Sequence, residues 1–403
     1  MRPSTTKRAF SFSLLSLALL ASGMSWFSGF ASHKAHAQNV AAAQRPEPSA
    51  AEMASRLAAI DAMVIRRMQM FNVPAYVLAI VKDGRTVFQK AYGYADLEKN
   101  IPATTDTVFG LASVTKSFTG VTLLSLVDKG LVNLDDPLDK YVDGLEGPYR
   151  KLPVRWVASM AAGVPSQLSR EVPWDKELEI LNSTPLASEP GSQYLYSNFS
   201  YRLVGSVIAK AYGKHYLEAV RETILQPLGM SSTATTVIME PTGRVAQAYG
   251  DGQGQGQLHP VSYKNPAVTT AAGMLASTSN DMIKYANGLL SRQILSPRAY
   301  QLLWYERPPL TTGEPNKWAF GFAAATNQAI GGFHQVSWNG GTPGVASLLI
   351  LVPEKNYGLV ALSNLRKHDV YEIGKTAHRL FFTGAEGQPE PPAQPQVIVP
   401  GED

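Results

Sequence analysis

The sequence predicts a mixed α/β (α+β) fold, in which helices flank an antiparallel sheet and a mainly helical domain is inserted into the chain. Three observations predict this class. An Asp83-Gly84 turn separates two apolar runs, helical periodicity dominates from Ser113 to about Gly229, and short strands alternate with helices after Ala267. Of the 403 residues, 45% are hydrophobic and 17% are charged, which excludes disorder over the whole chain.

The first elements are a helix and a hairpin. Residues 51–71 are predicted to form a helix, because apolar residues recur on one face at helical spacing. These residues are Leu57, Ile60, Met63 and Val64. Strands are predicted at 76–81 and 86–88, because an Asp-Gly pair between apolar runs is a strong hairpin signal.

The second half of the chain returns to the sheet. A helix is predicted near 281–290 and another at the end of the fold, with three strands between them; the strands lie around 318–325, 345–351 and 358–362, and the last helix over 370–382. This order suggests that the first and last strands share one antiparallel sheet. We expect an α/β domain made of residues 51–112 and 245–383, a helical domain of residues 113–244, and a site in the cleft between them.

The two ends of the chain carry different signals. Lys7 and Arg8 precede an apolar run, and small residues at Ala35 and Ala37 occupy the positions that a signal peptidase reads, which predicts a cleaved signal peptide over 1–37. An uncleaved membrane anchor is the competing interpretation. Residues 38–50 are interpreted as a linker, and the Pro-rich residues 384–403 are predicted to be a disordered tail. We expect a periplasmic or secreted protein without a stable membrane anchor after cleavage.

Composition and missing motifs exclude several classes of function. The first 37 residues hold four bases and no acid, so 36 − 4 = 32 bases face 32 acids in the remainder, a balance that argues against a nucleic-acid partner. Cysteine is absent, which excludes a thiol nucleophile. The sequence also lacks a Gly-x-Ser-x-Gly elbow, a His-Glu-x-x-His motif, a phosphate loop and a dinucleotide fingerprint. We predict no metal and no cofactor, and the oligomeric state stays open.

A Ser-x-x-Lys motif opens the helical block. Ser113 and Lys116 are three residues apart, so a helix beginning here puts them on one face. The amine can then take the hydroxyl proton, while free backbone N–H groups favour a developing oxyanion. The motif alone is weak, because Ser4 and Lys7 match it too, and Ser113 read alone serves equally well as a helix cap.

Two further segments carry polar groups suited to catalysis. Tyr196-Ser-Asn198 follows a Pro-Gly pair; a tyrosine on such a loop can relay a proton, and the amide can hold a lysine or a substrate carbonyl. Tyr263 and Tyr285 begin similar triplets, and a packing role is favoured for Tyr285. The segment from Trp338 to Gly344, Trp-Asn-Gly-Gly-Thr-Pro-Gly, can let a substrate backbone approach a strand edge. A tight turn is the alternative for this segment.

Taken in this order, the three motifs resemble those of the serine β-lactamase and penicillin-binding-protein superfamily. The similarity extends from about residue 51 to 382. It is strongest to the branch that holds class C β-lactamases, D-aminopeptidases, D-Ala-D-Ala carboxypeptidases and family VIII carboxylesterases. The resemblance implies a β-lactamase/transpeptidase-like fold.

The resemblance also implies a role for each motif residue. Ser113 would be the acylated nucleophile, Lys116 its general base or proton shuttle, and Tyr196 the second acid/base. Asn198 would contact substrate, and the N–H groups of Ser113 and Gly341 would form the oxyanion hole. A lysine that acts as a base needs burial or a nearby charge to lower its pKa.

Two departures from the family pattern bear on substrate choice. The His-Thr-Ser-Gly-Leu stretch of many members reads Met160-Ala-Ala-Gly-Val164 here, and the Lys or His that begins the third motif is replaced by Trp338. Indole cannot pair with a carboxylate and supplies an apolar wall with one N–H; esterase members often carry an aromatic residue there. With Gly340 and Gly341, Trp338 is expected to bind substrate. Arg366 and Lys367 are interpreted as solvated surface that can offer a charge instead.

The sequence therefore predicts an exported serine hydrolase that forms an acyl-enzyme on Ser113 and acts on small-molecule esters or small amides. A β-lactamase, D-Ala-D-Ala carboxypeptidase or D-aminopeptidase is the alternative among enzymes. A slowly deacylating penicillin-binding receptor or regulator is the alternative of another class.

Overall fold

The computed structural model describes residues 47–166, 174–252, 257–262 and 270–387. The signal peptide predicted over 1–37 and most of the predicted linker and tail lie outside these ranges. None of the helices in the described ranges is long and apolar enough to cross a membrane.

A tight hairpin starts the sheet, as predicted. β1 (Ala75–Lys82) and β2 (Arg85–Asp96) are joined through Asp83 and Gly84, whose φ values are 53° and 75°. Two central turn residues with positive φ match the right-handed twist of the flanking strands. β2 extends to Asp96, well past the predicted 86–88. Its exposed and buried residues do not alternate regularly, so the sequence pattern indicates only its first part.

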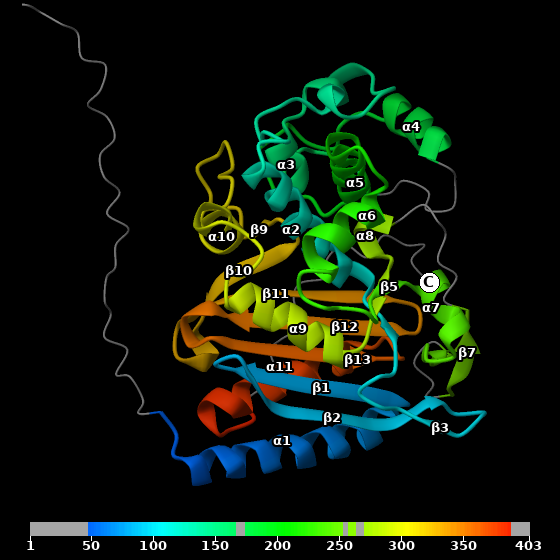
Figure 1. Cartoon of the computed structure of the whole chain (residues 1–403), viewed down its shortest axis with the longest axis vertical. Helices are drawn as coiled ribbons and strands as arrows, with labels where there is room; N and C mark the ends of the chain where they lie inside the picture. The colour runs from blue at the N-terminus through cyan, green and yellow to red at the C-terminus, as the bar shows by residue number, and fades with distance from the viewer. Residues whose placement is uncertain (1–46, 167–173, 253–256, 263–269, 388–403) are drawn as a thin grey trace, which may run out of the picture. The chain divides into compact units, whose positions relative to one another are not determined.

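The main sheet joins the two ends of the chain. Among the described residues it has eight strands in the order β3-β2-β1-β13-β12-β11-β10-β9 (Figure 1). β1 lies antiparallel to β13, with Tyr76 opposite Ser363, which confirms the predicted antiparallel sheet. The remaining strands of this sheet are β3 (Ile101–Pro102), β9 (Trp318–Ala319), β10 (Phe322–Asn327), β11 (Phe333–Thr342), β12 (Val345–Val352) and β13 (Tyr357–Ser363).

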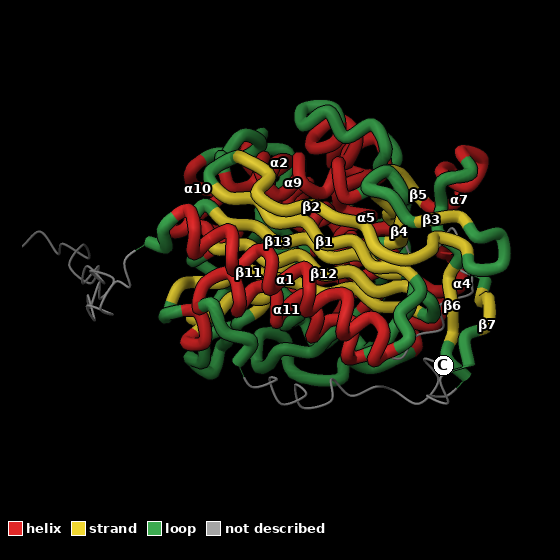
Figure 2. Tube along the Cα trace, turned by 90° about the horizontal axis from the view of Figure 1, so that it is seen from below, coloured by secondary structure: helices red, strands yellow, loops and turns green. Residues whose placement is uncertain are grey.

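Helices cover both faces of this sheet. α1 (Ala50–Phe71) and α11 (His368–Thr383) lie on one face (Figure 2), and α2 (Thr115–Asp128) and α9 (Ser279–Leu290) lie on the other. Alternate residues of β1 enter two different cores: Leu78 and Ile80 pack toward α1 and α11, while Val77 and Ala79 pack toward the helical side. Burial on both faces explains the continuous apolar run of this central strand.

α1 begins where its capping signal lies. The Ser49 hydroxyl accepts a hydrogen bond from the backbone of Glu52, and the Glu52 carboxylate accepts one from the backbone of Ser49, which satisfies two free helix donors reciprocally. The predicted apolar face is buried at Ile60, Met63 and Val64.

The helical region lies beyond α2 (Figure 1). Its helices are α3 (Val154–Ala158), α4 (Trp174–Ser183), α5 (Asn198–Tyr212) and α6 (Tyr216–Val220), and a one-turn 3₁₀ helix (Ala112–Val114) leads into α2. A three-stranded sheet lies beside it, made of β4 (Phe109–Gly110), β8 (Leu275–Ser277) and β5 (Ala234–Thr235). The remaining elements are α7 (Thr236–Met239), β6 (Ala248–Gly250), β7 (His259–Val261), α8 (Thr270–Gly273) and α10 (Pro297–Trp304).

Two parts of the structure differ from the sequence prediction. The third motif belongs to β11, a strand absent from the prediction because its polar and glycine residues resemble a turn. The first residues of the predicted tail are held in place: Arg379 donates from Nε to the carbonyl of Glu386 at 2.9 Å, and the Glu386 carboxylate forms ion pairs with Arg66 and Arg67. Glu386 therefore contacts both α1 and α11, and residues 388–403 of the predicted tail lie outside the described ranges.

Candidate active site

Ser113 lies in the 3₁₀ turn that precedes α2, and neighbouring strands hold this turn from two sides. The N–H of Leu111 donates to the carbonyl of Leu275 at 2.7 Å, and the Ser347 hydroxyl donates to the carbonyl of Leu111 at 2.6 Å. Ala112 has a φ of 41°, a left-handed conformation that is costly for a residue with a side chain. The backbone at Ser113 is thus fixed in a conformation that the surroundings must maintain.

Lys116 is fully buried and points its amine at Ser113. Its Nζ lies 3.0 Å from Ser113 Oγ, 2.7 Å from Asn198 Oδ1 and 2.6 Å from the carbonyl of Ala272. Three acceptors match the three donors of an ammonium group. The amine also lies 5.0 Å from the centre of the Tyr196 ring, within the range of a cation–π interaction.

Tyr196 contacts the same hydroxyl from the other side. Its OH lies 2.8 Å from Ser113 Oγ and donates to Asn198 Oδ1 at 3.2 Å. The Ser197 hydroxyl caps α5 by accepting from the N–H of Ser200. α5 therefore starts at Asn198, directly after its capping residue. The Asn198 carbonyl oxygen is used within the site, as an acceptor for both neighbours.

The two similar tyrosine triplets have other positions. Tyr285 is buried in α9 and stacks on Phe118 with ring centres 4.0 Å apart, which agrees with the predicted packing role. Tyr263 lies outside the described residues.

Gly340 allows β11 to approach the nucleophile turn. A Cβ placed on Gly340 would lie 2.2 Å from the carbonyl oxygen of Leu111 and 2.8 Å from the nitrogen of Ser113. Because such contacts are impossible, only glycine fits at this position. The third motif is therefore a strand edge beside Ser113, and the tight turn comes after it, at Pro343 and Gly344.

Trp338 forms an aromatic wall beside Tyr196. The two rings are stacked with centres 6.0 Å apart, and Trp318 meets Trp338 edge-on at 5.4 Å. The Trp338 side chain is buried, and its Nε1 lacks a hydrogen-bond partner among the described residues. The wall is apolar apart from this one donor.

Two side chains from the end of the sheet and from α11 complete the surroundings of the motif. A Cβ placed on Gly341 would lie 2.3 Å from the Tyr371 hydroxyl and 3.0 Å from Arg366 Nε. Arg366 is therefore half-buried next to the third motif, which corrects its interpretation as solvated surface. The sequence holds no signal for Tyr371, because it lies in the first turn of a helix distant from every motif.

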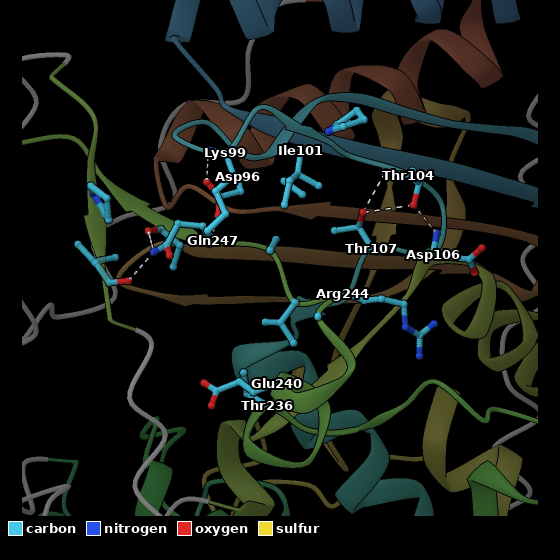
Figure 3. A pocket seen from close by; sticks show the side chains of 18 of the residues that line it. Asp96, Lys99, Ile101, Thr104, Asp106, Thr107, Thr236, Glu240, Arg244 and Gln247 are labelled. Atoms are coloured by element: carbon cyan, nitrogen blue, oxygen red, sulfur yellow. Dashed lines mark hydrogen bonds and ion pairs between the residues drawn. The ribbon is translucent and has the colours of Figure 1, made fainter.

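Cavity volume does not identify the site in this protein. A cavity of about 680 Å³ opens between the β2–β3 end of the sheet, α7 and the β6–β7 hairpin, and none of the motif residues lines it. Figure 3 shows Asp96 and Lys99 together on its wall, where they form an ion pair at 2.8 Å, and Asp106 accepts from Asn280. The site is identified here by the contacts of Ser113. In the described part of the chain, no cluster of three or more His, Asp or Glu side chains could hold a metal ion.

The comparisons with known proteins lead to the same superfamily. Protein flp from Staphylococcus aureus (strain N315) is 28% identical over 332 residues, which cover 78% of this chain and 64% of that protein, so this chain spans less than about two-thirds of that relative's length. Penicillin-binding protein 4* from Bacillus subtilis (strain 168) is 25% identical over 336 residues, covering 77% of this chain and 73% of that protein.

A solved structure and a family model extend the similarity. The octameric penicillin-binding protein homologue from Pyrococcus abyssi superposes with a TM-score of 0.70 and 26% identity, covering 80% of this chain and 76% of that one. The fold is therefore that of the β-lactamases and transpeptidases. Residues 60–381 match the family model described as Beta-lactamase. Since that match takes in most of the chain, the protein belongs to the β-lactamase family, within the serine β-lactamase and penicillin-binding-protein superfamily of hydrolases.

Proposed function

We propose that this protein is a serine hydrolase that forms an acyl-enzyme on Ser113. The observation that carries the proposal is the position of one hydroxyl between two acid/base groups: Ser113 Oγ lies 3.0 Å from Lys116 Nζ and 2.8 Å from the Tyr196 hydroxyl. Both distances allow direct proton transfer.

The reaction has two halves. Ser113 Oγ attacks the substrate carbonyl as its proton passes to the Lys116–Tyr196 pair, and the N–H groups of Ser113 and Gly341 bind the oxyanion. The same pair returns the proton to the leaving group, so the carbonyl–leaving-group bond breaks and the ester with Ser113 remains. Water then attacks the ester carbonyl and gives a proton to the same pair, which returns it to Ser113 Oγ as the ester bond breaks and the acid leaves.

We propose neutral esters or small amides as substrates. The tryptophan wall at Trp338 replaces the cation that would bind a substrate carboxylate, and an indole ring cannot pair with that charge. No contact with nucleic acid is proposed.

Arg366 favours a second candidate function. Its guanidinium lies beside Gly341 in the third motif, and a guanidinium can pair with a carboxylate. This contact favours a β-lactamase or a D-Ala peptidase. A slowly deacylating receptor is the third candidate and differs from both by the lifetime of its acyl-enzyme.

Intact mass spectrometry tests the proposal. The wild type, Ser113→Ala and Tyr196→Phe are exposed to a fluorophosphonate, a short p-nitrophenyl ester and a penicillin. We expect one adduct on wild-type protein, none on Ser113→Ala, and rapid loss of the ester adduct. A label on any other residue would overturn the mechanism, and a penicillin adduct that persists while esters do not react would favour the receptor.

We further propose that the protein is exported, with cleavage after about Ala37. The support is the basic start, the apolar run and the small residues at 35 and 37.

A further inference from the structure

The Tyr371 hydroxyl binds the peptide group that joins the two glycines of the third motif. Tyr371 lies in the first turn of α11, and its OH donates to the carbonyl oxygen of Gly340 at 2.9 Å. The nitrogen of this same peptide belongs to Gly341. A hydrogen bond accepted by a peptide carbonyl polarises the peptide and strengthens its N–H as a donor.

We propose that Tyr371 is a positioning residue that orients and polarises the Gly340–Gly341 peptide as an oxyanion donor. The inference rests on the proposed acyl-enzyme function, because it concerns the oxyanion of that reaction. Tyr371 contacts β11 on the face turned away from Ser113, and the inference gives it a part in binding the oxyanion on the Ser113 face.

One neighbour supports the donor role of this hydroxyl. Arg366 lies close to it, because a Cβ on Gly341 would lie 3.0 Å from Arg366 Nε and 2.3 Å from the Tyr371 hydroxyl. A cation near a hydroxyl favours negative charge on its oxygen and makes the hydroxyl a stronger donor. The phenolic proton goes to the carbonyl oxygen of Gly340, so this polarisation is passed to the peptide whose N–H belongs to Gly341.

The phenol keeps its proton over the working pH range. Burial raises the pKa of Tyr371 to about 12, although the nearby Arg366 opposes this shift. A neutral phenol has a proton to give, whereas a phenolate would face the carbonyl of Gly340 with an unfavourable charge.

The space for this contact exists because residue 341 has no side chain. A Cβ there would lie 2.3 Å from the phenolic oxygen, so any larger residue would displace the hydroxyl. The two positions therefore require glycine for different reasons. A side chain at Gly340 would collide with the turn that holds Ser113, and a side chain at Gly341 would collide with the Tyr371 hydroxyl.

Tyr371→Phe tests the role, with Tyr76→Phe as the matched control. Tyr76 is fully buried and also hydrogen-bonds to this end of α11, at the carbonyl of Val370, 3.2 Å away. It does not contact the glycine pair. We expect Tyr371→Phe to lower kcat for a p-nitrophenyl ester about tenfold, the effect of one hydrogen bond, with KM nearly unchanged. Tyr76→Phe should keep both constants.

Inhibitor binding separates a positioning role from a structural one. A boronic acid that forms a tetrahedral adduct places an oxygen in the oxyanion hole, so its affinity should fall about tenfold in Tyr371→Phe. Equal losses in the two Tyr→Phe variants, or a boronate affinity unchanged in Tyr371→Phe, would overturn the inference while leaving the acyl-enzyme intact. If wild-type Ser113 takes no label at all, the proposed function itself has failed.

A double-mutant cycle gives an independent readout. Gly341→Ala should lower kcat strongly in the wild type by pushing the hydroxyl away, and much less in Tyr371→Phe, where the hydroxyl is already gone. Additive losses would contradict the inference.

Discussion

Trp338 and Arg366 both lie in or beside the third motif, but Trp338 favours neutral substrates and Arg366 favours substrates that carry a carboxylate. Single substitutions can show which side chain determines the substrate preference. Trp338→Lys introduces an ammonium, and a charge-assisted contact to a carboxylate contributes about 1.5–3 kcal/mol, or about ten- to over a hundredfold in rate. We expect the kcat/KM for a penicillin to rise and that for neutral esters to fall. Without any change of preference, Trp338 would belong to the packing.

Arg366→Ala tests the second candidate directly. If carboxylate-bearing substrates depend on its guanidinium, their kcat/KM should fall about ten- to a hundredfold while neutral esters lose less. Lys367→Ala is the control, because Lys367 forms an ion pair with Asp251 at 2.8 Å. If kcat/KM falls equally for neutral esters and for carboxylate-bearing substrates, Arg366 does not bind the carboxylate and acts only through Tyr371.

Buried His378 predicts a pH dependence of stability. Burial, with a smaller effect from Arg379, lowers the pKa of His378 to about 3, whereas an unfolded histidine titrates near ~6.5. The unfolded chain therefore binds more protons between these values, so the stabilising effect is complete above about pH 6.5 and is lost as the pH falls toward 3.

Urea unfolding at several pH values measures this effect. Below about pH 6 the free energy of unfolding should fall by up to about 1.4 kcal/mol per pH unit more in the wild type than in His378→Phe. Phenylalanine keeps the ring contacts with Tyr357 and Phe382. His259→Gln, at an exposed position, should behave like the wild type. Parallel curves for wild type and His378→Phe would refute the assignment.

At the scale of elements, a buried ion pair ties α4 to α5. The Glu177 carboxylate pairs with the Arg202 guanidinium, and their side chains are 0% and 5% exposed. Breaking such a pair leaves an uncompensated charge, so Glu177→Gln should cost about 3–5 kcal/mol of unfolding free energy. The double variant Glu177→Leu/Arg202→Met should recover most of this loss. Glu179→Gln, whose partner Lys176 is exposed, should change little; a similarly small loss in Glu177→Gln would disprove the prediction.

The predictable elements are those whose burial follows a simple period. α1 has one buried stripe, β1 is apolar on both faces, and the hairpin has its Asp-Gly pair, so each could be located from the sequence. β11 could not, because its sheet position depends on Gly340 fitting against the turn of Ser113, a contact between distant segments. The motif residues could be found by spacing, but Tyr371 could not, since only the packing of α11 on the sheet brings it to Gly341. Arg366 could be identified as a charge near the site, but its contact with the third motif could not be read from the sequence for the same reason.

At the scale of the whole molecule, the chain closes on itself. β1 pairs with β13, and α1 packs beside α11 on the same face. Removing α1 would expose the apolar face formed by Leu78, Ile80 and Leu359. Deletion of residues 38–71 from the mature chain should therefore give insoluble or unfolded protein, measured by circular dichroism and sedimentation. A soluble variant with a cooperative melt would show that α1 is dispensable.

The proposed export makes a contrasting prediction for the residues ahead of α1. The buried positions of α1 begin at Ile60, so a chain that starts at Gln38 keeps the contacts of the helix with the other described residues. Expressed without residues 1–37, the protein should melt at the temperature of the exported form and turn over esters at the same rate. N-terminal sequencing of exported material should give a start at or near Gln38. The substitutions Ala35→Asp and Ala37→Asp place charges at the two cleavage positions, and should retain the uncleaved chain. Full-length protein in the cytoplasm, or a wild-type chain that stays firmly with the membrane, would contradict cleavage and support the anchor.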